Sequence, residues 1–230
     1  MKIASNIEIK KLSRIGILSR VKNRLFQNYS GRVVERKLEF DVNYWHIKDS
    51  SYLMGYWQSE KYFGQIRKQL LAEFELKNIL DKHNLKVLRD IKNSVSVSVQ
   101  IRRGDYVNNV KYANIFNVCN RDYYAKAFKL MKKKFGKVKF YFFSDDINWV
   151  KSNYVFGKNC VYVDINKSES YKDLILMKNC KHNIIANSSF GWWGAWLNTN
   201  PEKTVAIPKK WANDKNHCNK DMYPTAWTKL

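Results

Sequence analysis

The chain has 230 residues, of which 42 are Lys or Arg and 20 are Asp or Glu, so its formal net charge is +22. Hydrophobic residues make up 45% of it and aromatic residues 15%, which is enough to bury a core and argues against intrinsic disorder. The positive charge has a similar density in residues 1–93 and 94–230, so there is no basic tail. A sugar nucleotide, a polyanion and an acidic lipid surface all remain compatible with it.

Several protein classes find little support in the sequence. No apolar run is long enough to span a membrane, and charges interrupt the first 26 residues too often for a secretory signal. The cysteines are widely spaced without a C-x-x-C motif, which argues against a disulfide scaffold or zinc ribbon and favours free thiols. We therefore expect a cytoplasmic protein, with peripheral contact at the inner membrane face left open. The four cysteines are Cys119, Cys160, Cys180 and Cys218.

Residues 1–93 have a mainly helical pattern. Apolar residues from Ile3 to Leu25 recur at helical spacing, and Ile66, Leu70 and Phe74 follow an i, i+4, i+8 pattern. Between these stretches lies the sequence GYWQSEKYF at 55–63, which is too polar and too aromatic for a simple core stripe. We assign residues 1–93 to a first, partial domain.

From residue 94 the pattern changes to alternating strands and helices. Ser or Gln alternates with Val or Ile over residues 94–101, which is the period of two typical of a strand. The alternation of β and α elements predicts an α/β fold in residues 94–230, with a parallel sheet covered by helices. Further strands are predicted at 138–143, 160–163, 183–186 and 204–207, and helices at 123–135, 147–152, 171–179 and from about 190.

Polar residues follow four of these strands. Ligands of open parallel sheets bind beyond the carboxyl ends of the strands, so we expect these groups to converge on one site if the strand order permits. The groups are RRGD at 102–105, SDD at 144–146, Asp164, and NSS at 187–189.

The first group contains the best candidate for binding an anion. Strand alternation places Gln100 and Arg102 on one face and Arg103 on the other. A guanidinium is always charged and bonds two oxygens at once, which suits phosphate, so Arg102 is favoured with Arg103 in support. The alternative is that the two arginines pair with Asp105 in a solvated turn.

The other groups each allow two interpretations. Ser188 and Ser189 precede a helix, where free N–H groups and hydroxyls bind anions, but serine is also a common helix cap. Asp145 and Asp146 could accept hydrogen bonds from a base or a sugar, or they could cap the helix that follows. We interpret the aromatic block at 190–196 as mostly core.

Histidines and nucleotide motifs add little. His182 fits a structural role better than a catalytic one, and His46, His83 and His217 form no metal-ligand pattern. Neither G-x-G-x-x-G nor a P-loop occurs, so the usual dinucleotide and Walker interpretations lack support.

Five stretches resemble the bacterial α-1,2-fucosyltransferases of glycosyltransferase family 11, and together they run nearly end to end. The last stretch is long and unusual enough to be strong evidence alone. They are GYWQSEKYF at 55–63, IRRGDY at 101–106, VC at 118–119 with DYY at 122–124, FFSDDINW at 142–149, and residues 180–198 beginning CKHNIIANSSF.

This resemblance implies a GT-B fold of two Rossmann-like halves. Residues 1–93 are then a partial acceptor-side domain, and residues 94–230 bind the donor GDP-β-L-fucose. It implies an inverting, metal-independent transfer of fucose to the 2-hydroxyl of a terminal galactose, in a surface or lipid-linked glycan. The expected partners are therefore a sugar nucleotide and a glycan, and no nucleic acid.

The resemblance also implies roles for individual residues. Arg102 holds the diphosphate, and Arg103 is the second residue expected at the catalytic centre. Gln100, with either Asp145 or Asp146, contacts the guanine. The remaining donor contacts implied are Asn187, Ser188, Ser189 and Phe190.

Departures from the family pattern leave one alternative open. The family usually begins with a glycine-rich segment resembling GGLGNQ, which does not occur here, so the chain begins several dozen residues into the pattern. Gln100 stands where the family usually has His, and glutamine cannot act as an acid or base near neutral pH. Gly191 replaces a usual Ser. The alternative function is a truncated, non-catalytic remnant that retains at most binding of a GDP-sugar.

Overall fold

The computed structural model describes residues 4–13, 31–35, 38–76, 80–214 and 220–230. The chain divides into two compact units, residues 1–67 with 219–224 and residues 68–218 with 225–230. This division differs from the predicted boundary at 93/94. Helix α4 (Lys82–Lys92) belongs to the larger unit because it packs against α9 (Ser170–Asn179).

The smaller unit contains a pair of parallel strands, β1 (Arg32–Val34) and β2 (Tyr52–Met54), and helix α1 (Asn6–Ser13). The helical pattern predicted from Ile3 to Leu25 is confirmed over α1, and residues 14–30 lie outside the described residues. The unit also has three short 3-10 helices, η1 (Val42–His46), η2 (Glu60–Tyr62) and η3 (Gly64–Ile66).

The GYWQSEKYF motif supplies much of the aromatic packing of this unit. Tyr62 is buried, and its ring lies 4.8 Å from those of Phe40 and Tyr44 and 5.3 Å from that of Trp57. The carboxylate of Glu35 accepts the backbone N–H groups of Tyr56 and Trp57 and so fixes the start of the motif. The motif is therefore a structural centre of the smaller unit.

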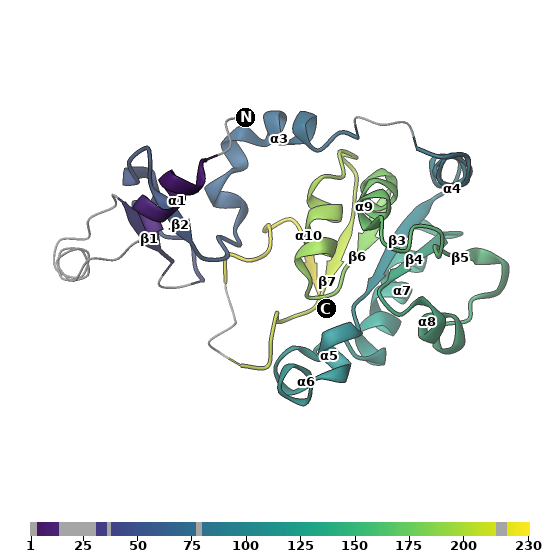
Figure 1. The fold of residues 1–230 in the computed structure, drawn as a ribbon. Coiled ribbons are helices and arrows are strands. Elements are labelled where there is room, and N and C mark those ends of the chain that lie inside the picture. The colour runs from purple at the N-terminus through teal and green to yellow at the C-terminus, as the bar shows by residue number, and fades with distance from the viewer. Residues whose placement is uncertain (1–3, 14–30, 36–37, 77–79, 215–219) are drawn as a thin grey trace. The chain divides into compact units, whose positions relative to one another are not determined.

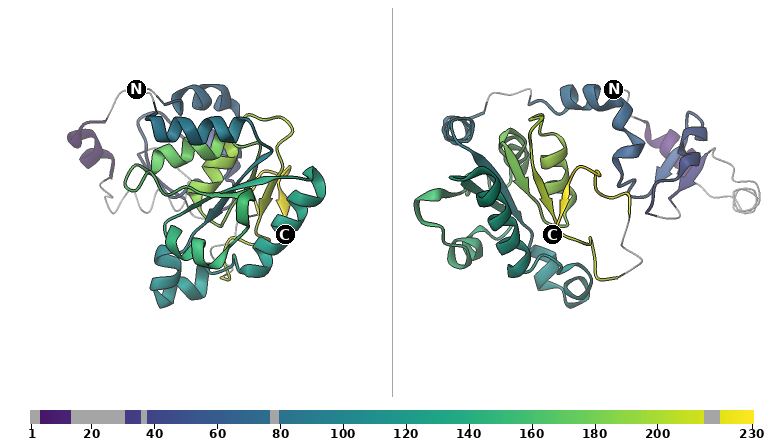
Figure 2. Two further views of the ribbon diagram at one scale, coloured as in Figure 1. Left: turned by 90° about the vertical axis from the view of Figure 1, so that its right-hand side faces the viewer. Right: turned by 180° about the vertical axis from the view of Figure 1, so that it is seen from behind.

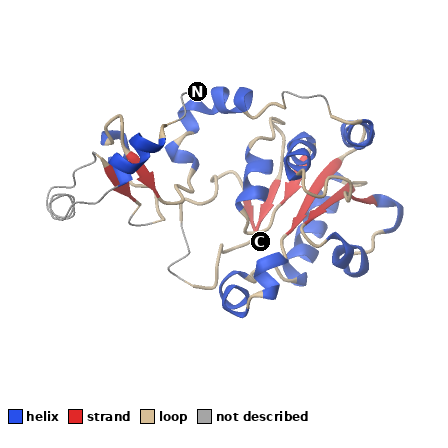
Figure 3. Ribbon diagram, in the orientation of Figure 1, coloured by secondary structure: helices blue, strands red, loops and turns tan. Residues whose placement is uncertain are grey.

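The larger unit begins near α3 (Arg67–Glu73). The apolar face predicted for this segment is only partly buried, because the flanking residues Ile66 and Phe74 are 47% and 36% exposed. Its other elements follow the predicted β–α alternation (Figures 1 and 3). They are β3 (Ser96–Ile101), α5 (Gly104–Asn108), α6 (Val110–Phe116), α7 (Arg121–Phe135), β4 (Lys139–Ser144), α8 (Ile147–Asn153), η4 (Gly157–Asn159), β5 (Cys160–Tyr162), β6 (His182–Ile184), α10 (Ser189–Trp196), β7 (Val205–Ile207) and β8 (Thr228–Lys229).

These strands form one six-stranded sheet in the order β5-β4-β3-β6-β7-β8, and every neighbouring pair is parallel. From β3 the chain first winds to β5 on one side and then crosses back to β6 on the other. This is the strand order of the Rossmann fold, so the α/β prediction and its parallel sheet are confirmed. The two-residue strand β8 was not predicted, because it is too short to show a period.

Helices cover both faces of this sheet (Figure 2). On one face Val97, Val99 and Ile101 pack against α7 and α8, and on the other Tyr141 and Phe143 pack against α4 and α9. Local signals set the ends of these helices. The side chain of Asn120 caps the start of α7, and Gly136, with a φ of 69°, ends it.

The polar face of β3 is buried too, although its sequence alternates like a strand with one solvated face. Ser98 Oγ accepts a hydrogen bond from Asn183 Nδ2 at 2.7 Å, and Asn183 Oδ1 accepts one from Asn198 Nδ2 at 2.8 Å. Ser96 Oγ accepts the N–H of Lys181. Because these polar groups are hydrogen-bonded, their burial costs little.

His182, at the start of β6, has the structural role that the sequence predicted. Its ring stacks on that of Phe135 with centroids 3.7 Å apart, and its Nδ1 accepts the N–H of Thr204 at 3.1 Å. Burial lowers the pKa of His182 to about 4, and the charges of Lys134 and Lys181 add to this effect. The imidazole is therefore neutral in the folded protein near neutral pH.

We expect His182 to destabilise the protein as the pH falls from about 7 to about 5. The unfolded chain binds the histidine proton near pH 6.5 but the folded state only near 4, so this group lowers the free energy of unfolding by about 2 kcal/mol over that range. Burial raises the pKa of Asp173 to about 6, which gives a contribution of opposite sign in the same range. Urea unfolding of wild type and His182→Asn at both pH values isolates the histidine, and parallel pH dependences would contradict the assignment.

No helix in the described part of the chain is long and apolar enough to cross a membrane.

Candidate functional site

The candidate site lies where the strand order of the larger unit reverses, between β3 and β6. In open parallel sheets this switch point opens a crevice at the carboxyl ends of the strands. The groups that follow β3, β4 and β6 all reach this edge, and hydrogen bonds join the first two directly. Asp164, which follows β5, instead pairs with Lys151 at 2.7 Å. Three of the four predicted polar groups therefore lie at the switch point.

Arg102 follows the last residue of β3 and has two carboxylate partners. Its Nη2 lies 2.7 Å from Asp105 Oδ1, and its Nη1 lies 2.9 Å from Asp145 Oδ2. Burial opposes its charge, but the hydrogen bond to Asp105 and the charges of both carboxylates outweigh this and raise its pKa. The predicted pair between Arg102 and Asp105 is thus present, and Arg102 also lies at the carboxyl edge of the sheet.

Arg103 is held more firmly. Its Nε donates to Asp146 Oδ2 at 3.0 Å, and its guanidinium carbon lies 3.5 Å from the ring centroid of Trp149, in a close cation–π contact. Its side chain is 20% exposed, compared with 36% for Arg102. Arg102 is therefore the arginine that is more open to a ligand, as the alternation argument predicted.

Asp145 and Asp146 connect the ends of β3 and β4. Asp145 Oδ1 accepts the backbone N–H of Arg103 at 2.9 Å, and Asp146 Oδ1 accepts the N–H of Trp149 and so caps α8. The cap interpretation is therefore confirmed for Asp146. A β-carbon on Gly104 would come within 2.5 Å of Asp145 Oδ2, so a larger residue there would displace this carboxylate.

Asn187 anchors the loop between β6 and α10 from the interior. It is 1% exposed, and its Nδ2 donates to the carbonyl oxygens of Phe116 and Trp211 at 2.9 and 2.7 Å. Its Oδ1 accepts from the thiol of Cys119 at 3.4 Å, and burial raises the pKa of that thiol to about 12, which keeps the proton in place. The side chain of Asn187 is thus fully used inside the protein.

The first residues of α10 present backbone N–H groups at the same edge. Ser188 is the N-cap residue, but its hydroxyl makes no capping hydrogen bond, so side-chain capping is not its role here. Ser189 is exposed, whereas Phe190 is half-buried and packs against the cluster under α4 and α9. The serine hydroxyls and the first helical N–H groups together suit an anion.

Gln100 lies beneath this loop and is 5% exposed. Its Oε1 accepts the backbone N–H of Ala186 at 3.2 Å, which ties β3 to the start of the loop. A β-carbon on Gly191 would lie only 2.2 Å from the same oxygen, so the glutamine occupies the space that a side chain there would need. In this structure Gln100 positions the loop.

Two aromatic residues at the site were missed by the sequence reasoning. Trp149 stacks on Arg103, and Tyr106 lies 5.7 Å from the guanidinium of Arg102. Burial raises the pKa of Tyr106 to about 12, so its hydroxyl remains a donor, and it bonds the carbonyl of Asn187 at 3.1 Å. Two signals could have pointed to them: each is the last residue of a stretch that resembles the family, and Trp149 and Tyr106 follow Asp146 and Arg103 by three residues, about one helical turn.

Comparison with known proteins identifies the family. The model of the family described as Glycosyl transferase family 11 matches residues 8–230. The chain belongs to this family. The predicted resemblance is thereby confirmed. The interpretation of the aromatic block at 190–196 as mostly core is also confirmed, because Trp192 and Trp196 are buried.

Named relatives of this family 11 chain include three glycosyltransferases. An Alpha-1,2-colitosyltransferase of Escherichia coli is 37% identical over 187 residues, which cover 80% of this chain and 64% of the relative. The O-antigen biosynthesis glycosyltransferase WbnK of Escherichia coli is 34% identical over 77% of this chain and 61% of its own length. The Galactoside 2-alpha-L-fucosyltransferase Sec1 of Mus musculus is 28% identical over 62% and 41%. The chain therefore spans less than two thirds of each of these relatives.

Proposed function

We propose that this chain is a galactoside 2-α-L-fucosyltransferase. It would transfer fucose from GDP-β-L-fucose to the 2-hydroxyl of a terminal galactose in a surface glycan, with inversion at the anomeric carbon. The observation that carries the proposal is the placement of Arg102 and Arg103 at the switch point of the sheet, in a chain of glycosyl transferase family 11. The names of the α-1,2-colitosyl and galactoside 2-α-L-fucosyl relatives support the linkage.

The proposed reaction develops negative charge on the GDP leaving group, and the site must stabilise that charge. The bond between the anomeric carbon and the β-phosphate oxygen breaks, its electron pair stays on GDP, and the acceptor oxygen forms the new bond as its proton is released. Arg102 would exchange a carboxylate for the phosphate, which is feasible because Asp105 is exposed and exposed ion pairs are weak. The first N–H groups of α10 would bind the same phosphate.

The guanine contacts remain part of the proposal. Asp145 and Asp146 would accept hydrogen bonds from the base while holding the two arginines, so that recognition of base and phosphate would share one network. We also propose that the transfer needs no metal, and that the protein works in the cytoplasm with peripheral contact at the inner membrane face.

The name of one relative favours a second donor sugar, colitose. The non-catalytic alternative is not favoured, because the chain belongs to glycosyl transferase family 11 and its named relatives are glycosyltransferases.

A transfer assay tests the proposal. The purified chain is incubated with a galactose-terminated oligosaccharide and either GDP-fucose or GDP-colitose, with EDTA present, and the linkage of the product is determined by NMR. We expect an α-1,2-linked product, formed faster from GDP-fucose. Faster transfer from GDP-colitose would replace fucose in the proposal, loss of transfer in EDTA would overturn its metal-independent part, and absence of transfer from both donors would favour the non-catalytic remnant.

A further inference from the structure

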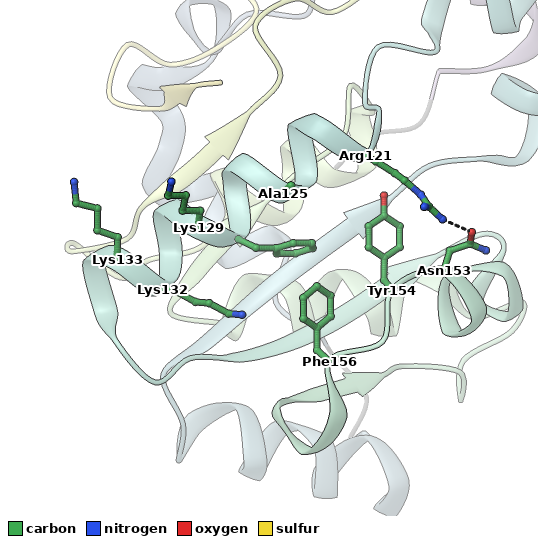
Figure 4. Close-up of a pocket in the computed structure, with 9 residues that line it drawn as sticks. Arg121, Ala125, Lys129, Lys132, Lys133, Asn153, Tyr154 and Phe156 are labelled. Atoms are coloured by element: carbon green, nitrogen blue, oxygen red, sulfur yellow. Dashed lines mark hydrogen bonds between the residues drawn. The ribbon is translucent and has the colours of Figure 1, made fainter.

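A pocket of about 660 Å³ lies on the outer side of α7, against the turn that follows α8 (Figure 4). We call it the basic-aromatic pocket. It shares no residue with the site at the switch point. It is lined by Arg121, Ala125, Phe128, Lys129, Lys132, Lys133, Asn153, Tyr154 and Phe156.

The charges of this pocket have a single sign. Its lining holds four cations and no carboxylate, and none of the four has an ion-pair partner within the described ranges. Arg121 is oriented by a neutral group, because its Nη2 donates to Asn153 Oδ1 at 2.9 Å. Lys126, on the same helix but outside the pocket, does have a carboxylate partner, Asp122 at 2.7 Å. The pocket is therefore a place where positive charge is left uncompensated.

The floor of the pocket is aromatic. Phe128 packs its ring against those of Tyr154 and Phe156, with centroids 6.1 and 4.8 Å apart. The ammonium of Lys132 lies 5.4 Å from the ring of Phe156, so the long lysine stems lie over an apolar base. Val155 lies between Tyr154 and Phe156 in the sequence, and its side chain is 74% exposed.

The basic surface continues beyond this pocket. A second hollow of about 260 Å³ shares Lys132 and Phe156 with it and adds Lys137 and Asn159. Its lining also lacks a carboxylate. Cations thus extend along the outer side of α7 and past its end.

We infer that this face docks on anionic phospholipid, with headgroup phosphates on the cations of the basic-aromatic pocket and Val155 inserted at the interface. Charge complementarity alone would fit any polyanion. The exposed side chain of Val155 favours lipid, because a membrane interface accepts both cations and apolar side chains, whereas a free phosphate uses only the cations. The inference locates the membrane contact of the proposed function but does not depend on transfer activity.

Vesicle co-sedimentation tests the inference with the full chain. Vesicles of phosphatidylcholine alone are compared with vesicles containing phosphatidylglycerol, for wild type and for the variant Lys129→Gln/Lys132→Gln/Lys133→Gln. Each basic residue near an anionic surface contributes about fivefold, so we expect this triple variant to bind the anionic vesicles about 125-fold more weakly. The matched control is Lys82→Gln/Lys86→Gln/Lys92→Gln, which removes the same charge from exposed positions of α4 and should bind nearly as wild type.

Further measurements separate lipid from other anions. Val155→Asp should also weaken binding to vesicles, and inorganic phosphate at the lipid concentration should not displace the protein. Equal losses in the pocket variant and its control would overturn the inference, and so would binding of an RNA oligonucleotide in place of vesicles through the same lysines. Transfer to a soluble acceptor should be unchanged in the pocket variant, so failure of the lipid inference is distinguishable from failure of the proposed function.

Discussion

Replacing Arg102 with alanine is expected to reduce the turnover number by at least about 100-fold while leaving the protein folded. In the proposed reaction, negative charge would develop on the departing phosphate next to Arg102, and removing one preorganised group of this kind typically slows the chemical step by about 100- to 1,000-fold. The protein should remain folded because the Arg102 side chain is 36% exposed. Without it, Asp105 is still solvated and Asp145 still accepts the backbone N–H of Arg103. Steady-state kinetics with saturating donor and acceptor measure the effect.

Two variants control for charge and for general damage. Arg102→Lys keeps the charge but cannot bond two phosphate oxygens at once, so its activity should fall between wild type and Arg102→Ala. Arg89→Ala removes an exposed arginine of α4 whose Nε bonds only the carbonyl of Leu85 in the same helix, and it should be fully active. Turnover of Arg102→Ala within a fewfold of wild type would contradict the role given to this residue.

Replacing Asn187 with alanine is expected to lower the free energy of unfolding by about 2 to 4 kcal/mol. The substitution removes two N–H donors and leaves the carbonyl oxygens of Phe116 and Trp211 without these partners, and each buried polar group left unsatisfied costs about 1 to 3 kcal/mol. The loop before α10 would also lose its anchor, so donor binding should weaken as well.

Urea unfolding followed by circular dichroism measures this change. The matched control is Asn148→Ala, an exposed asparagine of α8, whose effect should lie within about 0.5 kcal/mol of zero. Equal stabilities of Asn187→Ala and wild type would show that the interior hydrogen bonds of Asn187 do not hold the loop.

Strong periodicity is the part of the fold that the sequence predicts. The alternation at 94–101 and the helical spacing at 123–135 correspond to β3 and α7 because each buries an apolar face against the other. The same alternation places the serines and Gln100 on one polar face of β3. That face can be buried because Ser98 accepts from Asn183 and Ser96 accepts the N–H of Lys181, and pairing between segments 85 residues apart leaves no local signal.

The candidate site was predicted by residue type and place, and less well by side-chain direction. Arg102 and the acidic pair lie where strand ends predicted them. Gln100 and Asn187 also lie at these strand ends, but their amides bond the backbone inside the protein. A polar residue after a strand is equally suited to a ligand or to a loop, and only tertiary contacts decide between them.

The central claim is that the carboxyl edge of the six-stranded sheet binds a nucleotide diphosphate sugar through Arg102. Isothermal titration calorimetry with GDP-fucose, on wild type and Arg102→Ala side by side, tests it most directly. The structure predicts saturable binding with one site per chain for wild type, and binding at least about tenfold weaker for the variant, since a charge-assisted bidentate contact is lost. Equal affinities of the two proteins, or no binding to wild type, would contradict the claim.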